Sequence, residues 1–312
     1  METIQLTYPH NLKKEKISPS VAAIGFFDGI HEGHQAVIQT AVKKAKAKEL
    51  KSAVITFFPH PSVVLKKGKE TVHYITTVKE KEAFLSELGV DYLYIITFNK
   101  ELSQLSPAQF LEHFIEGLHI KHLVAGFDYT FGHKGAGNME NIHTFLPDDV
   151  EVTVIDKVDY ASEKISSTNI RAALKEGDVE KVHQLLGRPY FTSGVVVDGD
   201  KRGRQIGFPT ANLQIEEDKL LPKLGVYGVY VYVAGKKYYG LLNLGVKPTF
   251  HDHLPKPSPE VYILDFEEDI YGEMIEIEWI TFVREERKFN GIDEIVAQLT
   301  EDEKNIRKYF QI

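Results

Sequence analysis

A glycine-rich segment near the N-terminus carries two histidines in a spacing suited to phosphate chemistry. The segment reads Gly25-Phe26-Phe27-Asp28-Gly29-Ile30-His31-Glu32-Gly33-His34, and it lies between an apolar run and a helical pattern. A helix N-terminus offers free N–H groups and a positive dipole end to a phosphate, and glycines let the backbone approach a ligand closely. The two histidines that flank Gly33 can donate hydrogen bonds to phosphate oxygens and stabilise transition-state charge.

The His-x-Gly-His spacing of His31 and His34 is typical of nucleotidyltransferases, which position an adenylyl donor without forming a covalent enzyme intermediate. Two alternatives stay open: the four-residue pattern arises by chance, or the histidines bind a metal ion. Metal binding is the weaker alternative, because no carboxylate–histidine set nearby in the sequence completes a site.

Further polar residues follow predicted strands or begin a predicted helix. His60 stands between two prolines, Asp128 lies in the segment Gly126–Gly132, and Ser167, Thr168 and Arg171 begin a helix. The hydroxyl groups and the arginine fork can bind phosphates. Alternatively, Ser167 or Thr168 caps the helix, and the aromatic residues near Asp128 belong to the core.

A second group of polar residues lies in the C-terminal part of the chain. Thr210 and Asn212 are two residues apart on a predicted strand and therefore point to the same side. Their oxygens are hard ligands that suit Mg²⁺ shared with nucleotide phosphates. Glu260 begins another strand and is a candidate general base for a substrate hydroxyl. Turn chemistry for Thr210 and Asn212, and a solvated edge carboxylate for Glu260, remain the alternatives.

The first part of the chain alternates short apolar runs with helical patterns, which predicts a parallel sheet covered on both faces. Thr77 with Glu80, and Ser106 with Pro107, mark helix starts. A helix is expected over residues 34–49. The expected strands are residues 21–25, 53–58, 92–97, 122–125 and 150–155.

Two short helices, Ser167–Glu176 and Val179–Leu186, precede a change of character near Leu186. Six aromatic-rich strands without intervening helices then predict a closed antiparallel barrel. We therefore expect two domains, 1–186 and 187–312. Thr300 and Glu303 form a pattern typical of a capping box, which predicts a final helix over 304–310. The six strands are expected at residues 192–197, 211–215, 226–234, 237–243, 260–265 and 274–284.

Composition narrows the function classes. The chain has 45 acidic and 37 basic residues, a net charge of −8 and no cysteine. An acidic chain is a poor candidate for non-specific nucleic-acid binding, and the absence of cysteine excludes disulfides and thiolate metal sites. The sequence shows no apolar stretch long enough for a membrane helix and no signal peptide. We expect a cytoplasmic protein without a nucleic-acid or membrane partner, and the sequence does not indicate its oligomeric state.

Taken in order along nearly the whole chain, these motifs resemble one family closely, the bacterial bifunctional riboflavin kinase/FMN adenylyltransferases, also called FAD synthetases. The resemblance implies an N-terminal Rossmann-like nucleotidyltransferase domain and a C-terminal six-stranded riboflavin kinase barrel with a C-terminal helix. It also implies two reactions: riboflavin and ATP give FMN, and FMN with a second ATP gives FAD and pyrophosphate. Mg²⁺ and ATP would serve the kinase.

The resemblance also implies residue roles. His31 and His34 resemble the phosphate-binding pair, with Arg171 as a further catalytic residue. Glu260 matches the base that deprotonates the ribityl 5′-hydroxyl, Thr210 and Asn212 match the Mg²⁺–ATP ligands, and Arg284 resembles a flavin-side arginine. The other positions expected to bind nucleotide or flavin are Gly25, Phe26, Phe27, Asp28, Gly33, His60, Asp128, Ser167 and Thr168.

Two positions depart from the family pattern. Tyr262 stands where many members have histidine or another polar residue, and Phe58 stands where histidine often precedes the Pro-His-Pro stretch. We expect these departures to alter the affinity for the substrates.

Three other interpretations of the function stay open: one active domain only, a flavin-responsive binder without turnover, and a nicotinamide-dependent oxidoreductase. The last is disfavoured because Gly-x-Gly-x-x-Gly is missing after the first strand. His251-Asp252-His253 suggests a metal site, but its proline-rich surroundings favour a solvated loop.

Overall fold

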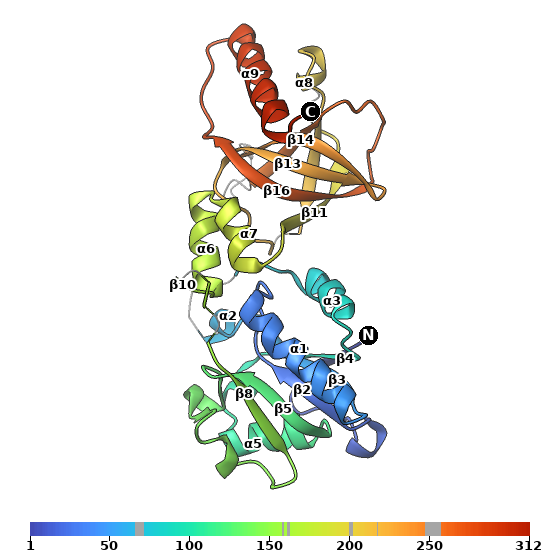
Figure 1. The fold of residues 1–312 in the computed structure, drawn as a ribbon, viewed down its shortest axis with the longest axis vertical. Helices are drawn as coiled ribbons and strands as arrows, with labels where there is room; N and C mark the ends of the chain where they lie inside the picture. The colour runs from blue at the N-terminus through green and yellow to red at the C-terminus, as the bar shows by residue number, and fades with distance from the viewer. Residues whose placement is uncertain (66–71, 158, 161–162, 200–201, 217, 247–256) are drawn as a thin grey trace. The chain divides into compact units, whose positions relative to one another are not determined.

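The computed structural model describes residues 1–65, 72–157, 159–160, 163–199, 202–216, 218–246 and 257–312. The chain forms two compact units, Met1–Ser167 and Thr168–Ile312 (Figure 1). The first contains a parallel sheet and the second a closed barrel, as the sequence predicts. The segment His251-Asp252-His253, considered above as a metal site, lies outside the described residues.

The first unit is built on six parallel strands in the order β1-β4-β3-β2-β5-β8. The chain runs outward from β2 through β3 and β4, and β5 then returns to the other side of β2. Ligands bind at such a switch point, beyond the carboxyl ends of the strands. The strands are β1 (Glu2–Leu6), β2 (Ser20–Ile24), β3 (Lys51–Phe58), β4 (Tyr92–Thr97), β5 (Ile120–Gly126) and β8 (Glu151–Ile155).

Successive strand residues face opposite sides of the sheet, so each face has its own core. Val21 and Ala23 pack with Val37 and Ile38 of α1 on one face, which Figure 1 shows crossed by this helix. Ala22 and Ile24 pack on the other face with Phe110 and Phe114, among others. The helical segments are α1 (Glu32–Ala47), α2 (Pro61–Leu65), α3 (Val78–Glu87), α4 (Lys100–Ser103), α5 (Pro107–Leu111), the π turn Glu112–Glu116 and the 3₁₀ turns Lys14–Lys16, His133–Gly135 and Ile142–Thr144.

The second unit contains a six-stranded barrel in which every neighbouring pair is antiparallel. It closes where β16 pairs with β11, so that the sheet has no free edge. Its strands are β11 (Tyr190–Val197), β12 (Thr210–Ile215), β13 (Gly225–Val233), β14 (Lys236–Val246), β15 (Pro257–Ile263) and β16 (Met274–Arg284). Its helices are α6 (Ser167–Glu176), α7 (Val179–Leu186), α8 (Arg202–Gln205) and α9 (Ile292–Phe310). Two short strand pairs belong to the first unit, β6–β7 (Thr130–Phe131, Gly137–Asn138) and β9–β10 (Asp159–Tyr160, Glu163–Lys164).

The helices α6 and α7 lie on the barrel side of the division between the units. The sequence places the boundary at Leu186, whereas the compact units divide after Ser167. The structure gives a reason, because α7 packs on β11 and β16 and the Lys223 amide donates to the Leu174 carbonyl of α6 at 2.8 Å.

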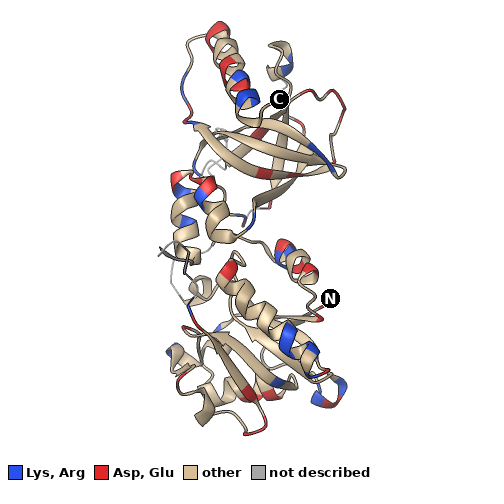
Figure 2. Cartoon of the chain, viewed as in Figure 1, with Lys and Arg blue, Asp and Glu red and all other residues tan. Residues whose placement is uncertain are grey.

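The prediction of a final helix over 304–310, capped by Thr300, is wrong. Thr300 does not cap a helix, because α9 is continuous from Ile292 to Phe310 and the Thr300 hydroxyl donates to the Val296 carbonyl one turn earlier. Figure 2 shows acidic residues towards the start of α9 and basic residues towards its end, which is the arrangement that the helix dipole favours.

Candidate active sites

The histidine pair of the first unit lies where the loop after β2 enters α1. His31 is the N-cap of α1, and its Nδ1 accepts a hydrogen bond from the His34 amide at 3.3 Å. Because Nδ1 accepts, the ring proton of neutral His31 lies on Nε2. The two rings are stacked, with centroids 3.6 Å apart. The sequence predicts a helix from His34, and the helix begins two residues earlier because His31 supplies the cap.

The ring of His34 is held against hydrophobic and cationic neighbours. Phe27 packs edge-on against it at a centroid distance of 5.3 Å. Burial lowers the pKa of His34 well below its ordinary value, and the charges of His31 and Lys81 lower it further. His34 is therefore neutral near pH 7. Its Nδ1 is buried without a hydrogen-bond partner in the described structure, so the site contains an acceptor or donor that a ligand can satisfy.

The loop that carries these histidines has a strained backbone. Phe27 has φ = 51° and Ile30 has φ = 41°, both in the left-handed region that side chains other than glycine rarely adopt. Gly25 makes room for Phe27, because a Cβ at Gly25 would lie 2.9 Å from the Phe27 ring. Such a conformation persists only where the surroundings determine it strongly, and it is concentrated at functional sites.

Asp28 connects this loop to two other segments. Its Oδ1 accepts hydrogen bonds from the amides of Ile75 and Thr76, at 2.9 and 3.2 Å, and its carbonyl accepts from the Ser167 hydroxyl at 2.8 Å. The carboxylate is buried. Asp28 and Ser167, both expected to bind ligand, therefore also hold the site together through hydrogen bonds within the protein.

His60 follows β3 and has a defined ring orientation. Its Nδ1 accepts from the Ser62 amide at 3.1 Å and lies 2.8 Å from the Ser62 hydroxyl, which places the ring proton on Nε2. Phe26 packs against it edge-on at 4.6 Å. Phe58 packs near Tyr74 and is 37% exposed, so this departure from the family pattern adds an aromatic ring at the end of β3.

The remaining predicted residues of this site lie on the elements that the sequence indicates. Gly33 lies in the first turn of α1, and Asp128 is exposed in the turn after β5. Thr168 and Arg171 lie in the first turns of α6, which begins at Ser167, and both belong to the second unit. Their participation in a nucleotide site stays a prediction.

In the barrel, strand register places Glu260 in a row of polar residues. Glu260 of β15 is opposite Asn212 of β12 on one side and Asn243 of β14 on the other. Directly opposed residues share a face of the sheet. Val261 and Leu242, the next pair, are fully buried and face the barrel interior. Glu260, Asn212 and Asn243 therefore lie on the outer face. The sequence predicts Asn243 at the end of a strand but not its position opposite Glu260, because register between strands is not visible in spacing.

The backbone of the glycine-rich turn after β11 lies directly against Asn212. A Cβ at Gly199 would lie 2.0 Å from the Asn212 Nδ2 atom, so a larger residue would displace this side chain. Asn212 is 7% exposed. Thr210, two residues earlier, lies opposite Tyr262, whose ring packs edge-on against Phe208 at 5.3 Å. The turn and the aromatic pair together limit the positions open to the two oxygen ligands.

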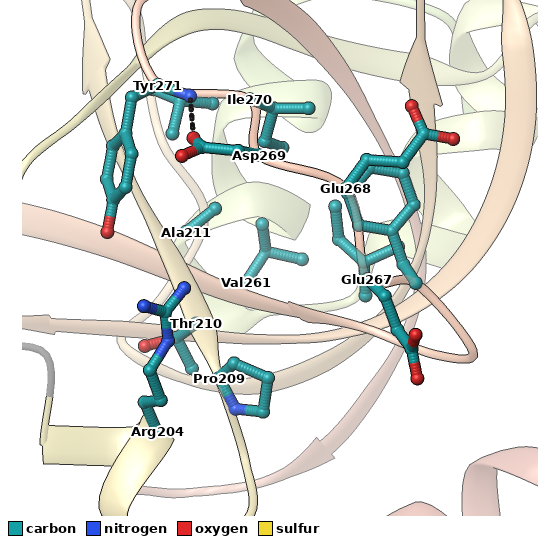
Figure 3. Close-up of a pocket in the computed structure, with 13 residues that line it drawn as sticks. Arg204, Pro209, Thr210, Ala211, Val261, Glu267, Glu268, Asp269, Ile270 and Tyr271 are labelled. Carbon is teal, nitrogen blue, oxygen red and sulfur yellow. Dashed lines mark hydrogen bonds between the residues drawn. The ribbon is translucent and has the colours of Figure 1, made fainter.

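A cavity of about 290 Å³ opens at the end of the barrel where β12 starts and β15 ends (Figure 3). Thr210 lies at this cavity together with Arg204, and the acidic segment Glu267–Asp269 forms another side. The segment is ordered in part by the Tyr271 amide, which donates to Asp269 Oδ1 at 3.2 Å. The cavity therefore offers a cation, a hydroxyl and carboxylates around apolar barrel residues.

Arg284 ends β16 and forms a partly buried ion pair with Asp302. Its Nε and Nη2 donate to the Asp302 carboxylate of α9 at 2.7 to 3.1 Å, and its Nη1 donates to the Glu285 carbonyl. Asp302 is 1% exposed. The guanidinium thus joins α9 to the barrel, and its expected contact with flavin stays a prediction.

Comparison with known proteins identifies the family. The model of FAD synthetase matches residues 13–169, and the model of riboflavin kinase matches residues 186–310. The bifunctional riboflavin kinase/FMN adenylyltransferase of Listeria monocytogenes is 48% identical over 310 residues, which is 99% of this chain and 98% of the relative. The chain belongs to the family of bifunctional riboflavin kinase/FMN adenylyltransferases. The member from Bacillus subtilis is 46% identical over 99% of this chain and 98% of its own length.

Proteins of lower sequence identity also match nearly the whole chain. The Escherichia coli K12 member of this family is 33% identical over 96% of each chain. A crystal structure from Streptococcus pneumoniae, described as a macrolide-efflux protein, is 36% identical and covers 98% of each chain with a TM-score of 0.88.

Within the residues that the structure describes, no helix combines the length and hydropathy that crossing a membrane requires.

Proposed function

We propose that the chain makes FAD from riboflavin in two ATP-dependent steps, with adenylyl transfer in residues 1–186 and the kinase in residues 187–312. The observation that carries the proposal is that two family models, FAD synthetase and riboflavin kinase, match consecutive parts of one chain. Relatives named for both activities match it over nearly their full length. Residues 1–186 supply groups suited to adenylyl transfer, and residues 187–312 supply groups suited to the kinase.

In the transferase, the FMN phosphate attacks the α-phosphorus of ATP in line, and pyrophosphate leaves. His31, with its proton on Nε2, and His34 donate hydrogen bonds to the phosphates, and the N-terminus of α1 stabilises the charge that develops on the leaving group. The remaining roles are positioning. Ser167, Thr168 and Arg171 bind phosphates, and His60, Asp128 and the residues Gly25, Phe26, Phe27, Asp28 and Gly33 surround ATP and FMN.

In the kinase, Glu260 removes the proton from the ribityl 5′-hydroxyl of riboflavin, the hydroxyl oxygen attacks the γ-phosphorus of ATP, and ADP leaves. The carboxylate suits this role because it lies in the polar row with Asn212 and Asn243 on the outer face of the barrel. The cavity lined by Arg204 and Thr210 is where we place ATP. Arg284 contacts the flavin side of the site.

Mg²⁺ fits the oxygen donors of this site. The Thr210 hydroxyl and the Asn212 side-chain oxygen are hard ligands on one face of β12, and Glu260 lies opposite Asn212. Two protein ligands are enough for this ion, which usually keeps several waters and binds substrate phosphates. When bound, Mg²⁺ neutralises phosphate charge during transfer.

We also propose a cellular setting and partners for the chain. The net charge of −8 disfavours non-specific nucleic-acid binding. The partners that we propose are the small molecules riboflavin, FMN and ATP, in the cytoplasm and without a nucleic acid or a membrane.

A time course with riboflavin, ATP and Mg²⁺, with flavins separated by chromatography, tests both steps in one experiment. FMN that rises and then gives way to FAD is the expected result. FMN alone contradicts adenylyl transfer in the first unit. If riboflavin is unchanged, the same assay with FMN supplied separates an idle barrel, which still yields FAD, from a flavin binder without turnover, which yields nothing.

A further inference from the structure

A lysine that the proposed mechanism does not use lies beneath the histidine loop. Lys81, on α3, is 5% exposed although it is charged. Its Nζ donates to the Phe26 carbonyl at 2.9 Å and to Thr56 Oγ1 at 3.2 Å. The Thr56 hydroxyl donates to the same Phe26 carbonyl at 2.9 Å. A buried ammonium costs free energy unless it is hydrogen-bonded, so this arrangement calls for an explanation.

The carbonyl that Lys81 holds comes directly before the strained part of the loop. Phe27, the next residue, has φ = 51° and places its ring edge-on against His34 at 5.3 Å. A continuous set of contacts therefore leads from Lys81 through the Phe26 peptide and the Phe27 ring to His34. The ammonium and the Thr56 hydroxyl together fix the orientation of this peptide.

The start of α3 is attached to the same loop at a second point. Asp28 accepts from the amides of Ile75 and Thr76, just before α3 begins, and the charge of Asp28 stabilises the ammonium of Lys81. The loop is thus fixed to the α3 segment by a carboxylate at one end and an ammonium at the other. Neither contact was visible in the sequence, where Lys81 is one of two lysines near the start of α3; the other, Lys79, is exposed.

We propose that Lys81 is a positioning residue for adenylyl transfer, which fixes the Phe26 peptide and through it the ring of His34. This inference rests on the function proposed for the first unit. Burial lowers the pKa of Lys81 to about 8, opposed by Asp28. The charged groups that bear on His34 are His31 and Lys81.

The kinase step of the same chain provides an internal control. In Lys81→Met we expect the kcat of adenylyl transfer to fall about 10- to 100-fold, as small misplacements of reacting groups cause, with a smaller change in KM for ATP. FMN formation should be unchanged. Lys79→Met, the matched control on the exposed side of α3, should leave both steps unchanged, and Lys81→Arg should recover a large part of the rate.

The pH profile separates positioning from simple structural support. Loss of the Lys81 charge raises the pKa of His34, so the acid limb of adenylyl transfer should move to higher pH in Lys81→Met. The wild-type rate should fall as pH rises through about 8, where Lys81 loses its proton, whereas Lys81→Arg should keep its rate there. Ring NMR signals of His34 measure the same pKa shift without turnover.

Several outcomes would overturn the inference. One is a Lys81→Met protein with wild-type kcat and pH profile, and another is a His34 pKa that stays unchanged. If Lys81→Met also loses the kinase step, Lys81→Gln decides, because it keeps a donor but carries no charge: full kinase activity with an unchanged pH profile of adenylyl transfer would contradict the inference. A wild-type chain that makes FMN but no FAD contradicts the proposed function instead, and the NMR titration then still tests the link between Lys81 and His34.

Discussion

In the first unit the proposed reacting side chains stand on a loop and a helix start, whereas in the barrel they stand opposite one another on paired strands. The loop keeps its shape through side chains from elsewhere in the unit, such as Thr56 and Lys81. The row of Asn212, Glu260 and Asn243 is placed by the backbone pairing of three strands. A loop site therefore depends on its supporting contacts, and a strand site depends on the register of its sheet.

The largest expected effect lies in the barrel. Glu260→Gln removes the proposed base while keeping the size of the side chain, and we expect the kinase rate to fall about 10²- to 10⁴-fold. FAD formation from supplied FMN should continue. Separate assays of the two steps measure this, and an unchanged kinase rate would show that Glu260 is not the base.

The matching change in the first unit should affect the other step. His31→Ala removes a proposed phosphate donor and the cap of α1, so we expect adenylyl transfer to fall about 10²- to 10³-fold. Riboflavin phosphorylation serves as the control. Equal loss of both steps would mean that the two sites are not independent.

A substitution that lowers the stability of the barrel should affect the kinase step before the adenylyl transfer step. Arg284→Met removes the guanidinium from the buried Asp302 carboxylate, which keeps the Gln298 amide as a donor. Because Arg284 is itself partly exposed, we expect a cost below the about 3–5 kcal/mol of a fully buried pair. We expect denaturant to unfold the barrel earlier, while adenylyl transfer from FMN persists at denaturant concentrations that already stop the kinase. A simultaneous loss of both steps would indicate that the two units unfold together.

The smallest expected effect concerns a helix cap in the first unit. Thr77 and Glu80 form a capping box at the start of α3, and Thr77→Ala should destabilise this unit by about 1 kcal/mol. Because α3 carries Lys81, adenylyl transfer should become more sensitive to heat than the kinase. Thermal inactivation of each step, with Thr300→Ala as a control for a threonine that does not cap, checks this.

Most of the fold was predictable because its elements have local signals. The strand Tyr92–Thr97 and the helices α6 and α7 begin and end at the predicted residues, since apolar runs and capping residues mark their ends. β1 was missed because only Ile4 and Leu6 of its residues are apolar and it lies at the edge of the sheet, paired with β4. The prediction of a helix start at Thr300 was wrong because the same residue pattern as a capping box also occurs inside a longer amphipathic helix.

Only those residues of the candidate sites that lie in recognisable motifs were predictable from the sequence. His31, His34 and Glu260 stand in recognisable local sequences. The supporting residues do not, because Lys81 and Asn243 gain their significance from contacts between segments distant in the sequence. Helical spacing from Val78 and Leu85 places Lys81 on the apolar side of α3, unlike Lys79, but it does not show which groups the ammonium contacts.

The pairing of β15 with its neighbours has a consequence for how this enzyme can be altered. Side chains alternate between the two faces of a strand, so inserting or deleting one residue in β15 would exchange Glu260 with Val261 and turn a carboxylate towards the barrel interior. Substitutions can tune the kinase, but changes of length within this strand would disrupt packing and chemistry together. Libraries for engineering new acceptor substrates should therefore keep the length of β15 constant and vary side chains on its outer face.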